Sequence, residues 1–180
     1  LRHHPQRRRA ADVGTGSGCI AVSLAAEIKD LRVLATDISL PALRVAQRNA
    51  RKHGVEERVH LLQCDLLPPP PLHLSPTHSF DVICANLPYI PTALLSQLPV
   101  ARYEPLLALN GGQDGLEVIR RFLRLLPAWV APGGIVLLEI EASQSAQALS
   151  LAYDVFSAAR IHLHPDLAGR DRLLEIQVRE

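Results

Sequence analysis

Ala10-Ala11-Asp12-Val13-Gly14-Thr15-Gly16-Ser17-Gly18 decides the fold of this chain, because it joins a predicted strand to a predicted helix through three glycines. The strand is predicted over Ala10–Val13 and the helix over Cys19–Ile28. Glycines at such a turn let the backbone approach a ligand, and the helix N-terminus behind them favours a negative group. The spacing is GxGxG rather than GxGxxG, so the loop alone is a weak signal beside a tight turn without ligand. The ligand-binding residues expected here are Gly14, Thr15, Gly16 and Gly18.

Short apolar runs alternate with amphipathic stretches along the rest of the chain. Further strands are predicted over 31–36, 59–63, 80–85, 135–140, 155–162 and an alternating run that holds Leu174, Ile176 and Val178. Further helices are predicted from Leu40 to Gly54, from Asp114 to Leu126 and over Ala142–Ala152. This order predicts an α/β fold: a Rossmann-like, doubly wound, mostly parallel seven-stranded sheet with an antiparallel last strand. No repeat or linker divides the chain, so residues 1–180 are expected to form one catalytic domain.

The connections carry their own signals. Leu87–Gly112 is a long irregular stretch, and loops of that length in a compact domain are usually lids or binding segments. Asp114 is predicted to be a helix N-cap with Glu117 as its capping-box partner. Pro132-Gly133-Gly134 is predicted to stop that helix, and Pro68–Pro71 to form a stiff loop.

Acidic residues follow two of the predicted strands at the edge where α/β sheets bind ligands. Asp37 ends the second strand about 20 residues after the glycines, where a carboxylate can accept both hydroxyls of an adenosine ribose. Its alternative role is a helix N-cap, although Ser39 could serve there. Asp65 ends the third strand and could accept from an adenine amino group, with the Leu66 backbone N–H on a ring nitrogen; the alternative is a plain turn residue. With Asn86 after the fourth strand, the pattern indicates an adenosine-bearing cofactor.

Asn86-Leu87-Pro88-Tyr89 follows the fourth strand directly. Pro88 has no N–H and pushes Leu87 into an extended conformation, so the turn can aim carbonyl oxygens and the Asn86 amide oxygen at one point. Such a cluster of acceptors suits a substrate that carries a planar NH2 group.

Three segments together resemble the class I S-adenosylmethionine-dependent methyltransferases that methylate amino groups: Asp12 to Gly18, Ala35-Thr36-Asp37-Ile38-Ser39 and Asn86 to Tyr89. A narrower resemblance, to the release-factor glutamine methyltransferases, is carried by Tyr89-Ile90-Pro91, Tyr103 to Leu109, Gly111-Gly112-x-Asp114-Gly115-Leu116 and Asp166 to Arg172. Leu87 stands where the usual Asn-Pro-Pro-Tyr motif has its first proline, as in some ribosomal RNA adenine dimethyltransferases; Glu104 to Leu116 argues for the release-factor family. That family also carries an N-terminal helical domain, which is expected to be absent here.

The resemblance implies S-adenosyl-L-methionine as cofactor and a peptide chain release factor as protein substrate, methylated on the glutamine of a Gly-Gly-Gln motif. It implies a place in translation termination, in the cytoplasm or in an organelle such as the mitochondrion. The cofactor contacts that it implies are Gly14, Thr15, Gly16, Gly18, Asp37, Ile38, Asp65, Leu66 and Asn86. The triplet Gly111-Gly112-Gln113 repeats the expected substrate motif, and we interpret this as chance.

A mechanism follows for the turn. Asn86 and the Leu87 carbonyl are each expected to accept one N–H of the substrate amide, which favours a localised nitrogen lone pair and stabilises developing positive charge. Tyr89 is expected to pack on the substrate, with plain wall packing as the alternative. Glu104 is expected to position the amide or brace the lid, with a solvated loop carboxylate as the alternative. The catalytic assignment thus covers Asn86, Leu87, Pro88 and Tyr89, and the substrate assignment Asn86, Tyr89 and Glu104.

Composition bears on the other classes of function that the sequence allows. Adenine-N6 methylation of RNA or DNA would also use an NH2 acceptor, but 4% aromatics and a net charge of +1 disfavour nucleic acid and membrane partners. A cofactor-binding module without turnover stays open, and a nicotinamide oxidoreductase leaves the Asn86 turn unexplained. Cys19, Cys64 and Cys84 are predicted to be buried free thiols, and the scattered histidines predict no metal site. The arginines near the start, Arg2 and Arg7 to Arg9, are interpreted as a solvated entry segment.

Overall fold

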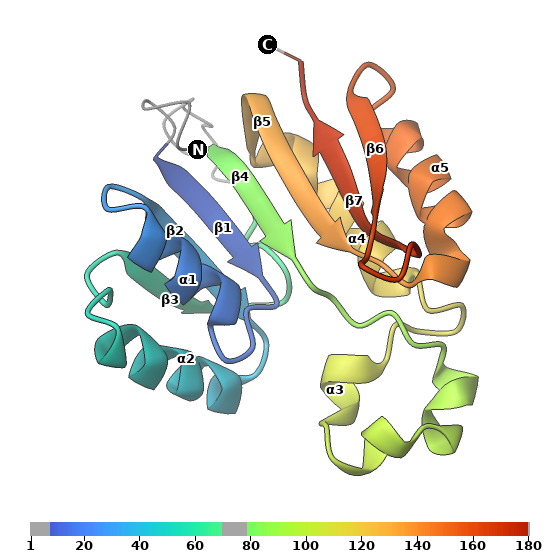
Figure 1. Cartoon of the computed structure of the whole chain (residues 1–180), viewed down its shortest axis with the longest axis horizontal. Helices are drawn as coiled ribbons and strands as arrows, with labels where there is room; N and C mark the ends of the chain where they lie inside the picture. The colour runs from blue at the N-terminus through green and yellow to red at the C-terminus, as the bar shows by residue number, and fades with distance from the viewer. Residues whose placement is uncertain (1–7, 70–78, 180) are drawn as a thin grey trace.

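The computed structural model describes residues 8–69 and 79–179 (Figure 1). Its strands are β1 (Arg9–Val13), β2 (Arg32–Asp37), β3 (Val59–Gln63), β4 (Phe80–Ala85), β5 (Val130–Glu139), β6 (Arg160–Pro165) and β7 (Asp171–Gln177). Its α-helices are α1 (Cys19–Glu27), α2 (Leu40–Lys52), α3 (Leu106–Leu109), α4 (Glu117–Leu125) and α5 (Ser145–Val155). Short 3₁₀ helices cover Thr92–Gln97, Pro99–Arg102, Leu126–Ala128 and Ala142–Gln144.

One sheet organises the described residues, in the order β3-β2-β1-β4-β5-β7-β6. The first five strands in this order pair in parallel, whereas β7 is antiparallel to both β5 and β6. The direction of strand addition reverses between β1 and β4, which is the switch point where open α/β sheets form their ligand crevice. In Figure 1 the arrowheads of β1, β4 and β5 all point toward the same edge of the sheet, where this crevice is expected. The predicted α/β fold with an antiparallel last strand is confirmed.

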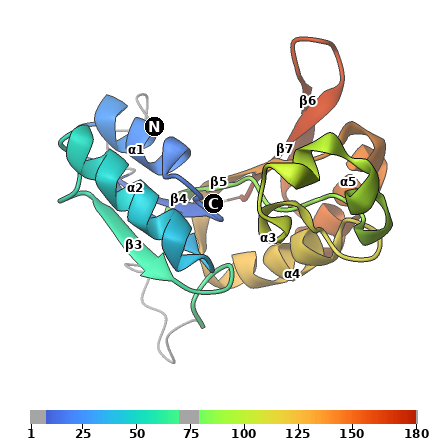
Figure 2. The same cartoon turned by 90° about the horizontal axis from the view of Figure 1, so that it is seen from below.

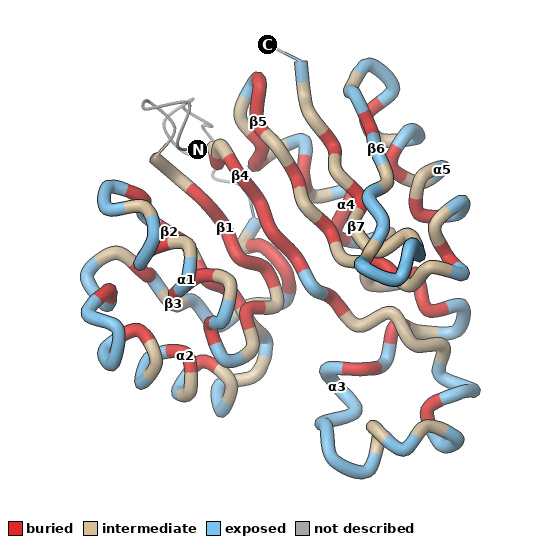
Figure 3. The backbone as a smooth tube through the Cα atoms, viewed as in Figure 1, coloured by how far each residue is buried: buried red, intermediate tan, exposed pale blue. Residues whose placement is uncertain are grey.

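Helices cover both faces of the sheet, and two hydrophobic clusters result. On one face, α1 and α2 pack against Ala10, Val82 and Cys84; on the other, α4 and α5 pack against residues such as Ile83. The neighbours Val82 and Ile83 therefore point to opposite faces and are both buried, as Figure 3 shows for the central strands. This burial on both faces explains why the parallel strands read as continuous apolar runs.

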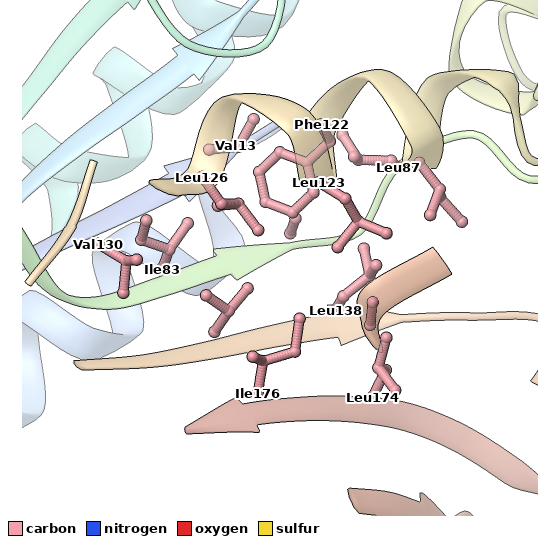
Figure 4. Packing of buried hydrophobic residues seen from close by; sticks show 14 of the residues in the cluster. Val13, Ile83, Leu87, Phe122, Leu123, Leu126, Val130, Leu138, Leu174 and Ile176 are labelled. Carbon is pink, nitrogen blue, oxygen red and sulfur yellow. The ribbon is translucent and has the colours of Figure 1, made fainter. Parts of the chain in front are cut away.

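Helix α4 contributes several large side chains to the hydrophobic cluster on the face that α4 and α5 cover. Phe122 and Leu123, together with Leu126 just after the helix, are fully or almost fully buried and lie over β4, β5 and β7 in Figure 4. The helical spacing of these residues predicted one apolar face, and that face lies on the sheet.

Two strands begin and end at residues other than those predicted. β5 begins at Val130 rather than Ile135 and contains Pro132-Gly133-Gly134, because its pairing with β4 jumps from Val130 opposite Phe80 to Ile135 opposite Val82. Such an irregularity accommodates proline and glycine inside a strand. The sixth strand covers Arg160–Pro165 instead of 155–162, because α5 continues to Val155 and Phe156 packs into the core from the helix end.

The predicted loop 87–112 is more ordered than expected. It contains the two 3₁₀ helices over 92–102 and helix α3, and we call residues 92–109 the arm. The arm returns to its start through a parallel bridge between Ile90 and Asn110. Figures 1 and 2 show it projecting at the carboxyl-end edge of the sheet.

The predicted N-cap at Asp114 was wrong. Helix α4 begins at Glu117, and Oδ1 of Asp114 instead accepts the backbone N–H of Leu116 at 2.9 Å, while its Oδ2 pairs with Arg120 at 2.7 Å. Glu117 still reaches backward, since its Oε1 accepts the N–H of Gln113 at 2.9 Å. The side-chain cap is therefore replaced by a turn of the chain before the helix.

Several predicted features lie at the margins of the described residues. The stiff loop predicted at Pro68–Pro71 lies partly outside the described residues. Arg2, Arg7, His3 and His4 lie wholly outside them. Cys19 is exposed at the start of α1, so its predicted burial was wrong, whereas Cys84 is buried. Across the described part of the chain, no helix has the length and apolar character needed to cross a membrane. Within residues 8–69 and 79–179, no group of three or more His, Cys, Asp or Glu could hold a metal ion.

Candidate functional site

A cavity of about 300 Å³ opens at the switch point between β1 and β4. The ends of β1 to β4 form its floor, and α3 of the arm and α4 face them. Its lining residues are Gly14, Gly16, Asp37, Ile38, Ser39, Ala42, Asp65, Leu66, Asn86, Leu87, Pro88, Pro105, Leu107, Ala108, Asn110, Val118 and Arg121. Most of the residues predicted for the cofactor and for the turn therefore meet in one place.

The glycine loop presents its backbone to this cavity. Gly14 and Gly16 have φ of +72° and +56°, a region that side chains rarely adopt. A Cβ on Gly16 would meet no atom within 4 Å, so this part of the loop is open, and the Gly16 N–H donates to Oδ2 of Asp37 at 2.8 Å. The two predicted cofactor elements, loop and carboxylate, are thus directly bonded to each other.

Thr15 and Gly18 belong to the loop but do not line the cavity. Thr15 is buried, and its Oγ1 donates to Oδ2 of Asp12 at 2.6 Å. A Cβ on Gly18 would lie 2.9 Å from Cβ of Ala46, so glycine is needed there for the contact between α1 and α2. The structure thus gives both residues a role in holding the loop, and their contact with the ligand stays a prediction.

Asp12 is a residue whose role the sequence reasoning missed. It is 1% exposed, and its Oδ2 also accepts the N–H of Ala21 at 3.0 Å, which ties the loop to the first turn of α1. Burial raises the pKa of Asp12, while the bonds from Thr15 and Ala21 oppose this rise. An acid inside an otherwise apolar strand, directly before the glycines, was the signal that could have found it.

Asp37 is held by the backbone in a fixed orientation. Its Oδ1 accepts the N–H of Ser39 at 2.8 Å, and its Oδ2 accepts from Gly16. The N-cap of α2 is Ser39, whose Oγ accepts from Ala42 at 3.3 Å, so the alternative role for Asp37 is not observed. A carboxylate has about four lone-pair sites, and two backbone bonds leave capacity for two hydroxyls. Ile38, 47% exposed, provides an apolar surface beside it.

The third strand end is partly engaged by α4. Asp65 forms an ion pair with Arg121, and both side chains are about half exposed. Leu66 has a φ of 62°, unusual for a residue with a side chain, and its carbonyl accepts from Thr36 Oγ1 at 2.6 Å. The sequence reasoning missed Arg121, because nothing local distinguishes it from other arginines on a helix surface.

The turn after β4 divides at Tyr89. Asn86 is exposed at the cavity, and Leu87 is buried with its side chain in the core while Pro88 also lines the cavity. Tyr89 faces a second cavity of about 460 Å³ with Ile90, Pro91 and Gln144. Its hydroxyl donates to Glu139 at 3.4 Å, and burial, with the Glu139 charge, raises the pKa of Tyr89. Tyr89 therefore lines a cavity separate from the one that Asn86 and Pro88 line, and its contact with the substrate stays a prediction.

Glu104 also lies away from the cavity wall. It is exposed on the arm, whereas its neighbours Pro105, Leu107 and Ala108 line the cavity. The arm therefore contributes an apolar wall to the site, and the substrate contact of Glu104 stays a prediction.

Comparisons with known proteins agree with this geometry. A family model described as a methyltransferase domain matches residues 10–99. The "Release factor glutamine methyltransferase" of Moorella thermoacetica is 48% identical over 163 residues, which cover 90% of this chain and 56% of the relative. The "Ribosomal protein uL3 glutamine methyltransferase" of Bordetella pertussis is 40% identical over 141 residues, covering 78% of this chain and 46% of the relative. The chain spans about half the length of these curated relatives.

A solved structure extends the comparison over the whole chain. The release-factor-specific protein-(glutamine-N5) methyltransferase of Alicyclobacillus acidocaldarius superposes with a TM-score of 0.57 at 26% identity, covering 100% of this chain and 85% of that one. The predicted resemblance is confirmed by these relatives. Since the matched residues 10–99 include the glycine loop, Asp37 and the Asn86 turn, and since these meet at one cavity, this chain belongs to the methyltransferase domain family.

Proposed function

We propose that this chain transfers the methyl group of S-adenosyl-L-methionine to the side-chain amide nitrogen of a glutamine in the Gly-Gly-Gln motif of a peptide chain release factor. The observation that carries the proposal is that Asn86, Leu87 and Pro88 line the same cavity as Gly16 and Asp37. The acceptor turn and the expected cofactor cradle therefore share one space. The release-factor enzymes named above support the choice of substrate. A substrate used in translation supports the cytoplasm as the site of the reaction, with an organelle such as the mitochondrion as the alternative.

The residues present fit an adenosine-bearing sulfonium cofactor. Gly16 leaves open space where a Cβ would stand, and Asp37 keeps lone pairs beside it. The cavity of about 300 Å³ falls within the usual range for small-molecule sites. The residues that would hold the cofactor are Gly14, Gly16, Asp37, Ile38, Asp65 and Leu66. When bound, it supplies an electrophilic methyl group on a positively charged sulfur.

The Asn86 turn then acts on the acceptor nitrogen. A carboxamide nitrogen is a poor nucleophile because its lone pair is delocalised into the carbonyl. The Asn86 side-chain oxygen and the Leu87 carbonyl each accept one of its two N–H bonds, which orients the nitrogen and favours a localised lone pair. Orientation of this kind contributes about 7–11 kcal/mol in well-aligned systems. The two acceptors would also stabilise the positive charge that develops on nitrogen as the N–C bond forms and the bond between sulfur and the methyl group breaks. The sulfonium would leave as a neutral thioether, and one N–H proton of the methylated nitrogen would pass to solvent.

The second candidate substrate is a glutamine of a ribosomal protein, because the name of one relative at 40% identity gives ribosomal protein uL3 as its substrate. The match to the release-factor enzyme is higher, 48% over 90% of this chain, and the release factor is therefore our first choice. Both substrates present a carboxamide, so the mechanism of the turn is unchanged.

The test is incubation of the chain with methyl-labelled cofactor and a panel of release factor, uL3, ribosomal RNA and DNA, followed by mass spectrometry. Label is expected on the release-factor glutamine and absent when that glutamine is replaced by alanine. Asn86→Ala is expected to keep cofactor affinity and lose most transfer, whereas Asn86→Asp, which keeps an acceptor oxygen, is expected to lose less. Label on adenine, or full turnover by Asn86→Ala, would refute the proposal.

A further inference from the structure

Gln144 connects three segments that are far apart in the sequence. It ends the 3₁₀ turn before α5, and its side chain is 7% exposed. Its Nε2 donates to the carbonyl oxygen of Tyr89 at 3.0 Å and to that of Asp114 at 3.3 Å. These two acceptors account for both protons of the amide nitrogen. Gln144 therefore holds the carbonyl that follows Pro88 in the candidate catalytic turn.

Two glycines make room for this contact. A Cβ on Gly115 would lie 2.4 Å from both Nε2 of Gln144 and the carbonyl oxygen of Tyr89. A Cβ on Gly111 would lie 2.7 Å from Cα of Tyr89. Contacts this short are not tolerated, so the segment around Gly111 and Gly115 can approach the Tyr89 backbone only without side chains. This explains Gly111 and Gly115 physically, and for Gly111 it does so without any reference to the Gly-Gly-Gln substrate motif.

The residue after Tyr89 is held from the arm's return. The Ile90 N–H donates to the Leu109 carbonyl at 3.0 Å, and the Gly111 N–H donates to the Ile90 carbonyl at 2.9 Å. At the other end of the turn, the buried Leu87 side chain is anchored in the core. The turn is thus fixed by packing before Pro88 and by hydrogen bonds after it, and Gln144 supplies the first of those bonds.

We propose that Gln144 is a positioning residue for methyl transfer: by holding the Tyr89 carbonyl against the Asp114 carbonyl, it sets the orientation of the Asn86 and Leu87 oxygens. The proposal rests on the proposed function. The role requires an amide, because a carboxylate of the same shape has no proton to donate and would place negative charge against two carbonyl oxygens. Oε1 of Gln144 is itself buried and accepts no hydrogen bond from the described residues, so this site is poorly suited to a charge.

Misplacement of a reacting geometry by about 1 Å costs on the order of 10²-fold in rate. We therefore expect Gln144→Met, which keeps the volume without the donor, to lower kcat by about 10-fold to 10²-fold on this basis. Cofactor Kd is expected to stay near the wild-type value, because Gln144 does not line the cofactor cavity. Gln147→Glu is the matched control for Gln144→Glu, because Gln147 is exposed on the adjoining helix α5, lines the same second cavity and undergoes the same change of charge.

The pH profile separates positioning from general destabilisation. The carboxyl introduced by Gln144→Glu is buried, so its pKa is raised, and on protonation it regains one O–H donor. Its kcat relative to wild type is expected to rise as the pH falls from about 8 to about 6, a range set by how far burial raises a carboxyl pKa. The relative kcat of Gln144→Met is expected to stay flat. Wild-type kcat in Gln144→Met, or a loss of cofactor affinity equal to the loss of rate, would overturn the positioning role.

Nuclear magnetic resonance gives a readout that does not depend on the substrate. Gln144→Met is expected to shift the side-chain NH2 signals of Asn86 and the carbonyl signal of Leu87, whereas Gln147→Glu leaves them in place. Unmoved signals would refute the inference even if no substrate were methylated. Conversely, moved signals in a chain that methylates nothing would refute the proposed function and leave Gln144 as the residue that orients the turn.

Discussion

Leu87 packs directly against Gly14. A Cβ on Gly14 would lie 3.0 Å from Cδ2 of Leu87 and 3.5 Å from the carbonyl oxygen of Asn86. The glycine loop after β1 and the turn after β4 therefore share a wall of the cavity. Leu87 replaces the proline of the related motif, and its side chain, 3% exposed, fills the space beneath the turn. Packing thus supplies part of the rigidity that a second proline would give.

Leu87→Ala is expected to lower the free energy of unfolding by about 2–5 kcal/mol, because it leaves a cavity where Leu87 joins the core. Urea unfolding measures this. Leu107→Ala is the control, because Leu107 lines the same cavity at 56% exposure and should change the free energy by no more than about 0.5 kcal/mol. Equal losses in the two variants would show that Leu87 does not brace the turn.

Asp37→Ala is expected to weaken cofactor affinity by about 10-fold or more, because hydrogen bonds to a charged group contribute about 1.5–3 kcal/mol each. The variant removes both the acceptor for ribose and the brace on the Gly16 N–H. Isothermal titration calorimetry with S-adenosylmethionine measures the Kd. Asp30→Ala removes an equally negative but exposed side chain and should leave Kd unchanged. Intact affinity in Asp37→Ala would exclude the ribose contact.

Asp12 makes stability depend on pH in a direction opposite to that of a salt-bridged carboxylate. Burial raises its pKa above 3.8, so the folded chain binds this proton more tightly than the unfolded chain. The stability of the wild type relative to Asp12→Asn is therefore expected to rise as the pH falls through the raised value, and to level off below 3.8. Unfolding both proteins in urea across this range measures the difference. If the stability of the wild type relative to Asp12→Asn instead decreased as the pH was lowered, the hydrogen bonds to Asp12 would outweigh burial in setting its pKa.

Cys19 and Cys84 are expected to differ in reactivity toward alkylating reagents. Cys19 is exposed, whereas Cys84 is buried and its pKa is raised to about 12 by burial and the nearby Asp12 charge. The thiolate is the reactive form, so Cys19 should be modified first and Cys84 only when the chain unfolds. Mass spectrometry after timed iodoacetamide treatment follows each site. A Cys84 that reacts in the native protein as fast as Cys19 would contradict the buried environment.

Local patterns sufficed for much of the fold. Val59–Gln63 and Phe80–Ala85 were predicted with their observed bounds, because each is a short apolar run closed by residues that favour a turn. The predicted bounds of two other strands were wrong because tertiary packing outweighed the local pattern there. Pro132-Gly133-Gly134 reads as a stop, yet β4 pairs across it through an irregularity. Val155 and Phe156 read as the start of a strand, yet Val155 is the last residue of α5 and Phe156 is its C-cap.

The same division holds for the site. Gly14, Gly16, Asp37 and Asn86 could be predicted because each follows a strand, and parallel strands bring their carboxyl ends to one edge. Tyr89 lines a second cavity and Glu104 is exposed on the arm, so a local motif did not show that neither residue lines the first cavity. Their substrate contacts stay predictions. Arg121 reaches the cavity from α4, and Gln144 holds the Tyr89 carbonyl from the 3₁₀ turn before α5; no local signal marks either residue.

By itself, the sequence determined that a parallel sheet presents glycines, a carboxylate and an amide at one edge, since the positions of the strands along the chain and their apolar pattern are local properties. Only the tertiary structure decided which side chains share the cavity and which hold its walls. The reason is that contacts such as Gln144 with Tyr89, 55 residues apart, depend on how helices and strands pack rather than on the residues beside them.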